Sequence, residues 1–151
     1  MEEDEYKSTY NELAAVRCVF EKALTNHRAK CGLSKHFCLA DREGYSCEDE
    51  SSSDKCRDFL EKLCEKSTFV LKLHEISGPL PHNMEIRVQA GGLMGLAKLV
   101  GERAGDPLKE PVIDDISRIL NRANEQYGAL ENLPYSEIIQ SVVQFQGRRR
   151  R

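Results

Sequence analysis

One residue type and several sequence patterns are missing from this chain, and each absence excludes a class of function. It has no tryptophan and few other aromatic residues, so it lacks a platform on which nucleic-acid bases would stack. It has no apolar run of the length that a membrane span needs. Its acidic first residues lack the apolar stretch of a secretory signal. We therefore expect a cytoplasmic protein that binds neither membranes nor nucleic acids.

Cysteine is absent after Cys64, whereas all six cysteines lie between Cys18 and that residue. A chain of 151 residues can bury a sufficient core without covalent staples. Cytoplasmic thiols are kept reduced, so structural disulfides are not expected there. A confined set of thiols in such a protein is typical of a metal or redox site. The first half of the chain is therefore predicted to build that site.

Short cysteine knuckles and catalytic motifs are also missing. At least six residues separate any two neighbouring cysteines, which argues against zinc ribbons and fingers, because these take two thiolates from one tight turn. An iron–sulfur cluster tolerates wider spacing, since separate elements reach its inorganic core. The chain contains no nucleophile elbow, Walker loop or dinucleotide-binding glycine motif. We expect no catalytic residues and no independent enzyme activity.

Hydrophobic periodicity predicts an all-α fold, a single-domain bundle of four to five helices with a Cys-bearing loop between the first two long helices. The expected helices cover residues 6–30, 53–74, 84–103, 112–123 and 136–145. In the second of these Ser53 and Asp54 are expected to form the N-cap region, and Asn83 is expected to cap the third.

The stretch between the first two long helices is the least regular part of the sequence. We expect a short helical turn at 36–42 and then a loop that carries Cys47. The single domain would cover residues 1–147, with a Cys-containing half at 6–76 and a Cys-free half at 84–146. The arginines at 148–151 are expected to be a disordered basic tail. The rest of the chain is acidic, which disfavours DNA binding.

Three glycines lie unexpectedly inside the third predicted helix, at Gly91, Gly92 and Gly95. Each costs about 1 kcal/mol relative to alanine in a helix interior. Such a segment usually lets something large approach its backbone, either another helix or a cofactor. The alternative is a short strand at 86–90 followed by a glycine turn.

Four of the six thiols are predicted to bind one [4Fe–4S] cluster: Cys18, Cys31, Cys47 and Cys56. Cys31 lies at the expected end of the first helix, and Cys47 lies on the expected loop. Cys18 and Cys56 would lie within reach of that loop. The positive N-terminal end of the second helix would also lower the pKa of Cys56 and favour its thiolate.

The two remaining thiols and the other kinds of site are alternatives. Cys38 could replace Cys47 as the fourth ligand or be a core residue, and Cys64 is interpreted as a buried, inert thiol. A mononuclear zinc site could use His27 or His36 beside Cys31 and Cys38. Disulfides, or six unrelated buried thiols, are the other possibilities.

The predicted function is that of a small iron–sulfur protein. It would serve in electron transfer, cluster carriage or redox sensing, as an accessory to a larger enzyme, so its partner would be a redox enzyme or another accessory protein. The alternative is a zinc-stabilised or metal-free helical module for protein–protein interaction.

Overall fold

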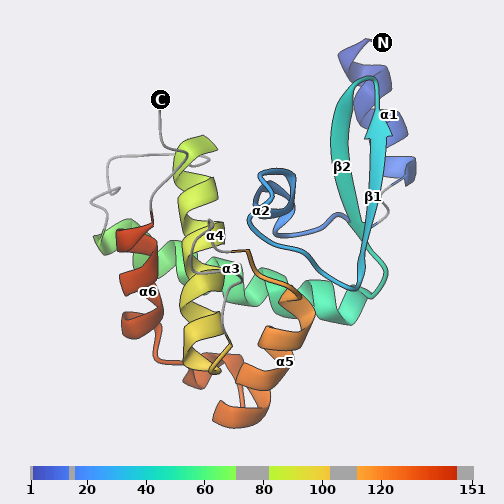
Figure 1. The fold of residues 1–151 in the computed structure, drawn as a ribbon. Helices are drawn as coiled ribbons and strands as arrows, with labels where there is room; N and C mark the ends of the chain where they lie inside the picture. The colour runs from blue at the N-terminus through green and yellow to red at the C-terminus, as the bar shows by residue number, and fades with distance from the viewer. Residues whose placement is uncertain (1, 14–15, 71–81, 103–111, 146–151) are drawn as a thin grey trace.

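The computed structural model describes residues 2–13, 16–70, 82–102 and 112–145 (Figure 1). The predicted basic tail at 148–151 lies outside the described residues. The elements in chain order are α1 (Glu3–Leu13), α2 (Glu21–Thr25), β1 (Ser34–Leu39), β2 (Arg42–Cys47), α3 (Glu50–Val70), α4 (His82–Leu99), α5 (Ile116–Tyr127), the 3-10 helix η1 (Leu130–Asn132) and α6 (Tyr135–Gln144).

The all-α prediction is wrong, because the described residues contain a two-stranded antiparallel sheet beside the helices. The stretch expected to form a helical turn and a loop is a β-hairpin in which Leu39 pairs with Arg42. Ala40 and Asp41 between them both have positive φ, 50° and 66°. Two such residues form the kind of turn whose twist matches that of the flanking strands. The hairpin projects from the helical body, and α1 lies beside it (Figure 1).

The single helix predicted at 6–30 is also wrong, because the chain leaves the helical path between α1 and α2. Arg17 forms an isolated bridge with Ser46, so this segment runs as a short extended stretch beside β2. The second break follows α2, where His27 takes a left-handed φ of 58°. Pairing with the hairpin thus replaces the helical hydrogen bonds that the local periodicity favoured.

The four helices predicted after residue 50 are present, with changed ends. The first of them, α3, begins at Glu50, so Ser53 and Asp54 lie inside it rather than at its cap. The carboxylate of Asp49 precedes it and accepts hydrogen bonds from Ser51 and Ser52. Likewise α4 begins at His82, so Asn83 is inside the helix. The alternative of a strand at 86–90 is excluded.

The glycines of α4 face protein rather than a cofactor site. A Cβ on Gly91 would lie 2.7 Å from the Val142 Cα, and one on Gly95 would lie 2.6 Å from the Ile138 carbonyl oxygen. A Cβ on Gly92 would meet Leu63 of α3 at 2.4 Å. The two helices α4 and α6 therefore pack backbone to backbone, with α3 running across them (Figure 1).

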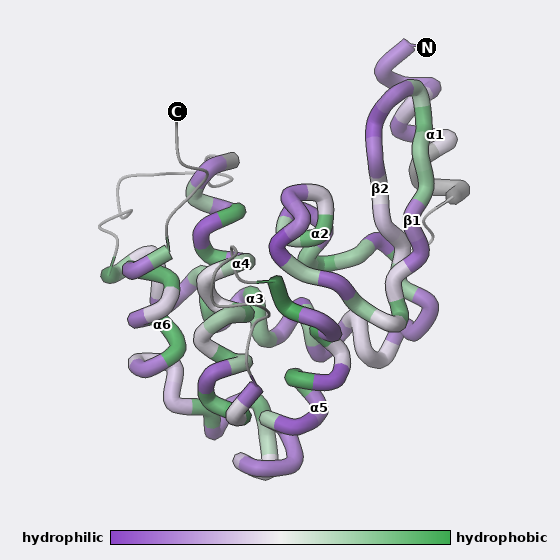
Figure 2. Tube along the Cα trace, in the orientation of Figure 1, coloured by the Kyte–Doolittle hydropathy of each residue, from purple (hydrophilic) through white to green (hydrophobic). Residues whose placement is uncertain are grey.

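One apolar core joins the two halves of the chain. Phe59 of α3 lies between Phe20 and Tyr135, with ring centroids 6.3 Å and 6.1 Å away. Hydrophobic residues recur among hydrophilic ones along α3, α5 and α6 (Figure 2), as in amphipathic helices, whereas α4 buries an unbroken run of residues at 88–93. The cysteine-bearing segments pack against this core through Cys18, Cys31, Cys56 and Cys64.

Candidate metal centre

The four predicted ligands come from four separate segments. Cys18 lies in the turn before α2, Cys31 in the loop after it, Cys47 at the end of β2 and Cys56 in the second turn of α3. Local sequence does not bring these segments together, because at least eight residues separate any two of the four cysteines. Their relative positions depend on contacts between the segments.

Backbone hydrogen bonds hold the segment of Cys18 against that of Cys47. The Cys18 N–H donates to the Tyr45 carbonyl oxygen at 3.0 Å, and the Cys47 N–H donates to that of Val16 at 2.8 Å. Because these bonds join main-chain atoms, they place Cys18 and Cys47 close together without using the neighbouring side chains.

The Cys31 segment is held by the residues that precede α5. The Lys30 N–H donates to the Ile113 carbonyl oxygen at 2.8 Å. Asp115 caps α5 by accepting from the Ser117 N–H at 3.1 Å, and the same carboxylate oxygen accepts from the Gly32 N–H at 3.1 Å. One side chain thus caps the start of α5 and fixes the residue after Cys31.

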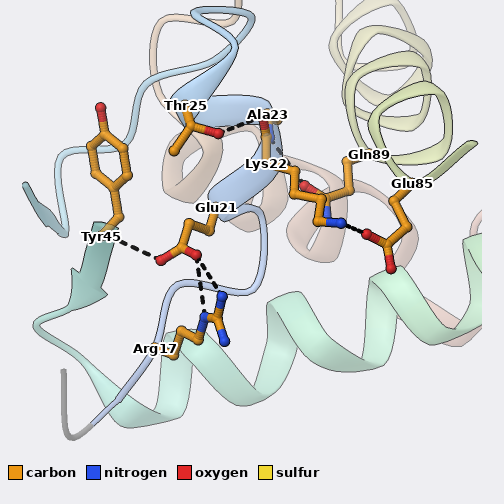
Figure 3. A network of polar contacts seen from close by, with 8 residues as sticks. All are labelled: Arg17, Glu21, Lys22, Ala23, Thr25, Tyr45, Glu85 and Gln89. Carbon is orange, nitrogen blue, oxygen red and sulfur yellow. Dashed lines mark hydrogen bonds and ion pairs between the residues drawn. The ribbon is translucent and has the colours of Figure 1, made fainter. Parts of the chain in front are cut away.

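Polar contacts also hold α2, the helix between the first two thiols (Figure 3). Glu21 accepts hydrogen bonds from the Arg17 guanidinium at 2.7 Å and from the Tyr45 N–H at 3.0 Å. On the other side Gln89 of α4 accepts from the Ala23 N–H at 3.1 Å. The short helix is therefore tied to both the hairpin and the main helical body.

The four predicted thiols line one small pocket of about 20 Å³. Its wall is formed by these cysteines together with apolar and hydroxyl-bearing side chains. The lining residues are Cys18, Val19, Phe20, Cys31, Leu33, Ser34, Cys47, Ser52, Ser53, Cys56, Ile116 and Ser117. Cys38 and Cys64 are not among them.

The four thiols are close enough to interact electrostatically. Besides burial, Cys31 and Cys47 raise the pKa of Cys18, Cys47 raises that of Cys31, and the other three thiols raise that of Cys56. Burial raises the pKa of Cys18 and of Cys56 to about 12, and neighbouring thiols add to both shifts. Burial also raises the pKa of Cys31. Without a bound cation these three groups are therefore neutral thiols at pH 7, since removing a charge from water is costly.

Neighbouring backbone groups partly offset the effect of burial on two of the thiols. Hydrogen bonding from the backbone of Phe20 lowers the pKa of Cys18, and hydrogen bonding from the backbone of Leu33 and Ser117 lowers that of Cys31. Such bonds favour thiolate over thiol. The wall thus offers donors to sulfur ligands that carry negative charge.

The structure separates the two remaining cysteines from this group. Cys38 is exposed on β1, opposite Glu43, so the alternative that made it a core residue is wrong. Cys64 is half-buried against the apolar core, and burial raises its pKa, which agrees with its interpretation as an inert thiol.

The histidines of the alternative zinc site do not line the pocket. His27 is exposed beyond the end of α2, so it does not lie on a helix shared with Cys31. His36 is exposed on β1, with its Nε2 3.7 Å from the Glu43 carboxylate and its ring tilted against that of Tyr45, the ring centroids being 5.0 Å apart. In the described part of the chain no group of three or more His, Cys, Asp or Glu side chains is arranged to hold a single metal ion.

One further expectation about the site is wrong. Cys56 is not at the N-terminus of its helix, because α3 begins six residues earlier, and burial raises rather than lowers its pKa. Of the two neighbours expected beside the glycines of α4, the structure shows the helix and not the cofactor, because Val142 of α6 lies beside Gly91 and Leu63 of α3 lies beside Gly92.

Sequence reasoning missed the serines and Asp115 around the thiols. Ser53 precedes Cys56 by three residues, a spacing that puts both on one face of a helix. The serine run at 51–53 was interpreted only as a helix start. Asp115 is 84 positions beyond Cys31 in the chain, so no local pattern could link them.

None of the helices in the described ranges is both long and apolar enough to cross a membrane. The chain matches no protein-family profile, no curated protein and no solved structure.

Proposed function

We propose that this protein binds one [4Fe–4S] cluster through Cys18, Cys31, Cys47 and Cys56. It would act in electron transfer, cluster carriage or redox sensing, as an accessory to a larger enzyme. The observation that carries the proposal is that these four thiols, from four separate segments, line one pocket from which Cys38 and Cys64 are absent.

The donor set suits the cluster chemically. Iron–sulfur clusters are held by four cysteine thiolates and tuned by hydrogen bonds to their sulfurs. The cluster's iron ions would stabilise the thiolates whose formation burial opposes. The N–H groups of Phe20, Leu33 and Ser117 would donate to those ligands.

Loading must widen the pocket, because about 20 Å³ has room for about one water molecule and the inorganic core is larger. Three of the four thiols lie outside helices, on segments that can shift without breaking helical hydrogen bonds. Cys56 on α3 would be the fixed ligand. A single zinc ion would instead require sulfurs about 3.8 Å apart, given Zn–S bonds of about 2.3 Å.

Anaerobic purification followed by iron, sulfide and zinc analysis tests the proposal. We expect a brown protein that holds about four iron and four sulfide per chain and loses its colour in air or with a chelator. A colourless protein with one zinc would support the zinc-stabilised interaction module. A metal-free protein that cannot be reconstituted with iron and sulfide would support the metal-free module. Either result overturns the proposal.

A further inference from the structure

Ser53 is a buried hydroxyl group in the wall of the thiol pocket. Its side chain is only 1% exposed, and its hydroxyl oxygen has no hydrogen-bond partner among the described residues. Folding a polar group away from water without a partner costs free energy, so buried hydroxyls are nearly always paired. An unpaired hydroxyl in a pocket wall indicates that the pocket's occupant supplies the acceptor.

Neighbouring serines of the same wall do have partners within the protein. The Ser52 hydroxyl donates to the Asp49 carboxylate at 2.6 Å, and the Ser34 hydroxyl donates to the Cys31 carbonyl oxygen at 2.7 Å. Ser53 differs from both. It lies one helical turn before Cys56, on the same face of α3.

We propose that Ser53 donates a hydrogen bond to a sulfur atom of the bound cluster and thereby raises the cluster's reduction potential. This inference rests on the proposed function. When an electron enters the cluster, negative charge on its sulfide and thiolate sulfurs increases, and a hydrogen bond to them becomes stronger. The bond therefore favours the reduced form. No covalent bond forms or breaks, and an electrode supplies the electron.

The test is the reduction potential of the reconstituted Ser53→Ala variant, measured by voltammetry. We expect its iron and sulfide contents to equal those of the wild type. At a given potential the ratio of oxidised to reduced cluster should rise about tenfold. This corresponds to a reduction potential about 59 mV more negative for a one-electron couple. In the metal-free protein the same substitution should raise the unfolding temperature, because it removes an unpaired buried hydroxyl.

Ser67 is a matched control on the same helix. It is completely buried, and its hydroxyl is likewise unpaired, but it does not line the pocket. Ser67→Ala should stabilise the metal-free protein and leave the potential unchanged. The inference is overturned if the potential of loaded Ser53→Ala equals that of the wild type, or if Ser67→Ala shifts it equally. If the wild type binds no iron and sulfide, the proposed function fails and the inference fails with it.

Discussion

Residues 16–56 reach their positions largely through backbone hydrogen bonds between short segments, whereas α4 and α6 pack directly on each other through glycine contacts and apolar side chains. The Cys18–Tyr45 and Cys47–Val16 bonds exemplify the first region, and the approach of Gly91 to Val142 exemplifies the second. Main-chain pairing leaves side chains available for chemistry, while the contact between α4 and α6 is too close for a ligand to enter. The comparison explains why the thiol pocket lies in the first region and not between these two helices.

Substituting any one of Cys18, Cys31, Cys47 or Cys56 by serine should have the largest effect and should be confined to the first region. We expect near-complete loss of bound iron, because a cluster needs all four thiolates. Iron analysis and visible absorption measure the effect, while circular dichroism should show that the helices persist.

Cys38→Ser and Cys64→Ser are the matched controls and should keep their iron. The ligand assignment is wrong if Cys64→Ser abolishes binding, or if one of the four pocket variants retains a full cluster.

Gly91→Ala or Gly95→Ala should damage the second region instead. The new Cβ would lie within 2.7 Å of α6 backbone atoms, which cannot rotate away, so α4 and α6 must separate. We expect the free energy of unfolding to fall by about 2 kcal/mol, measured by urea denaturation, with iron still bound in the folded protein. Gly92→Ala should lower the free energy of unfolding by less, because its new Cβ would meet the end of the Leu63 side chain and not the backbone. Unchanged stability in Gly91→Ala would show that the two helices do not pack this closely.

Asp115→Ala should affect both regions, because its carboxylate caps α5 and binds the Gly32 N–H beside Cys31. Loss of such a cap costs about 1 kcal/mol. We also expect faster loss of the cluster to a chelator, since the Cys31 segment loses an anchor. The exposed neighbour Asp114 provides the control substitution, Asp114→Ala. Equal rates of iron loss to the chelator in Asp115→Ala and Asp114→Ala would contradict the proposed anchoring of the Cys31 segment by Asp115.

Tyr135→Phe should have the smallest effect, about 1 kcal/mol at neutral pH, because it removes the hydrogen bond from the Tyr135 hydroxyl to the Leu130 carbonyl oxygen at 2.7 Å. Burial first, then Asp58 and Glu131, raises the pKa of Tyr135 to about 12. The unfolded tyrosine ionises near pH 10. The stabilisation by the protonated Tyr135 side chain is therefore fully present below about pH 10 and is lost as the pH rises toward 12.

The measurement is the difference in the free energy of unfolding between wild type and Tyr135→Phe from pH 8 to about 12. Taking the difference cancels the ionisation of the thiols, which both proteins contain. We expect the difference to shrink across the upper half of this interval. A difference that stays constant would mean that Tyr135 is not protected from ionisation in the folded protein.

The four long helices after residue 50 could be predicted because their apolar residues recur at helical spacing and burial follows that pattern. The N-terminal part could not, because the periodicity around Phe20 and Leu24 resembles that of a longer helix. There, pairing between the segment of Arg17 and β2 overrides the local preference. Such pairing joins residues far apart in sequence and leaves no periodic signal.

The four pocket thiols stay a prediction as a ligand set, and part of the reasoning for them does not match the structure. The sequence predicts Cys47 on a loop and Cys56 at a helix terminus, whereas Cys47 ends β2 and Cys56 lies in the second turn of α3. Both nevertheless line the pocket. The exclusion of Cys64 followed from its apolar neighbours, which a local pattern does record. No local pattern records the unpaired hydroxyl of Ser53, since being unpaired depends on every surrounding residue.

The amino-acid sequence by itself determined which half of the chain carries the thiols and where the amphipathic helices lie, because composition and periodicity are local properties. Only the tertiary structure decided which thiols meet, that α6 and Leu63 rather than a cofactor occupy the glycine face of α4, and that Ser53 is buried without a partner. The physical reason is that these facts depend on hydrogen bonds and packing between segments separated by tens of residues.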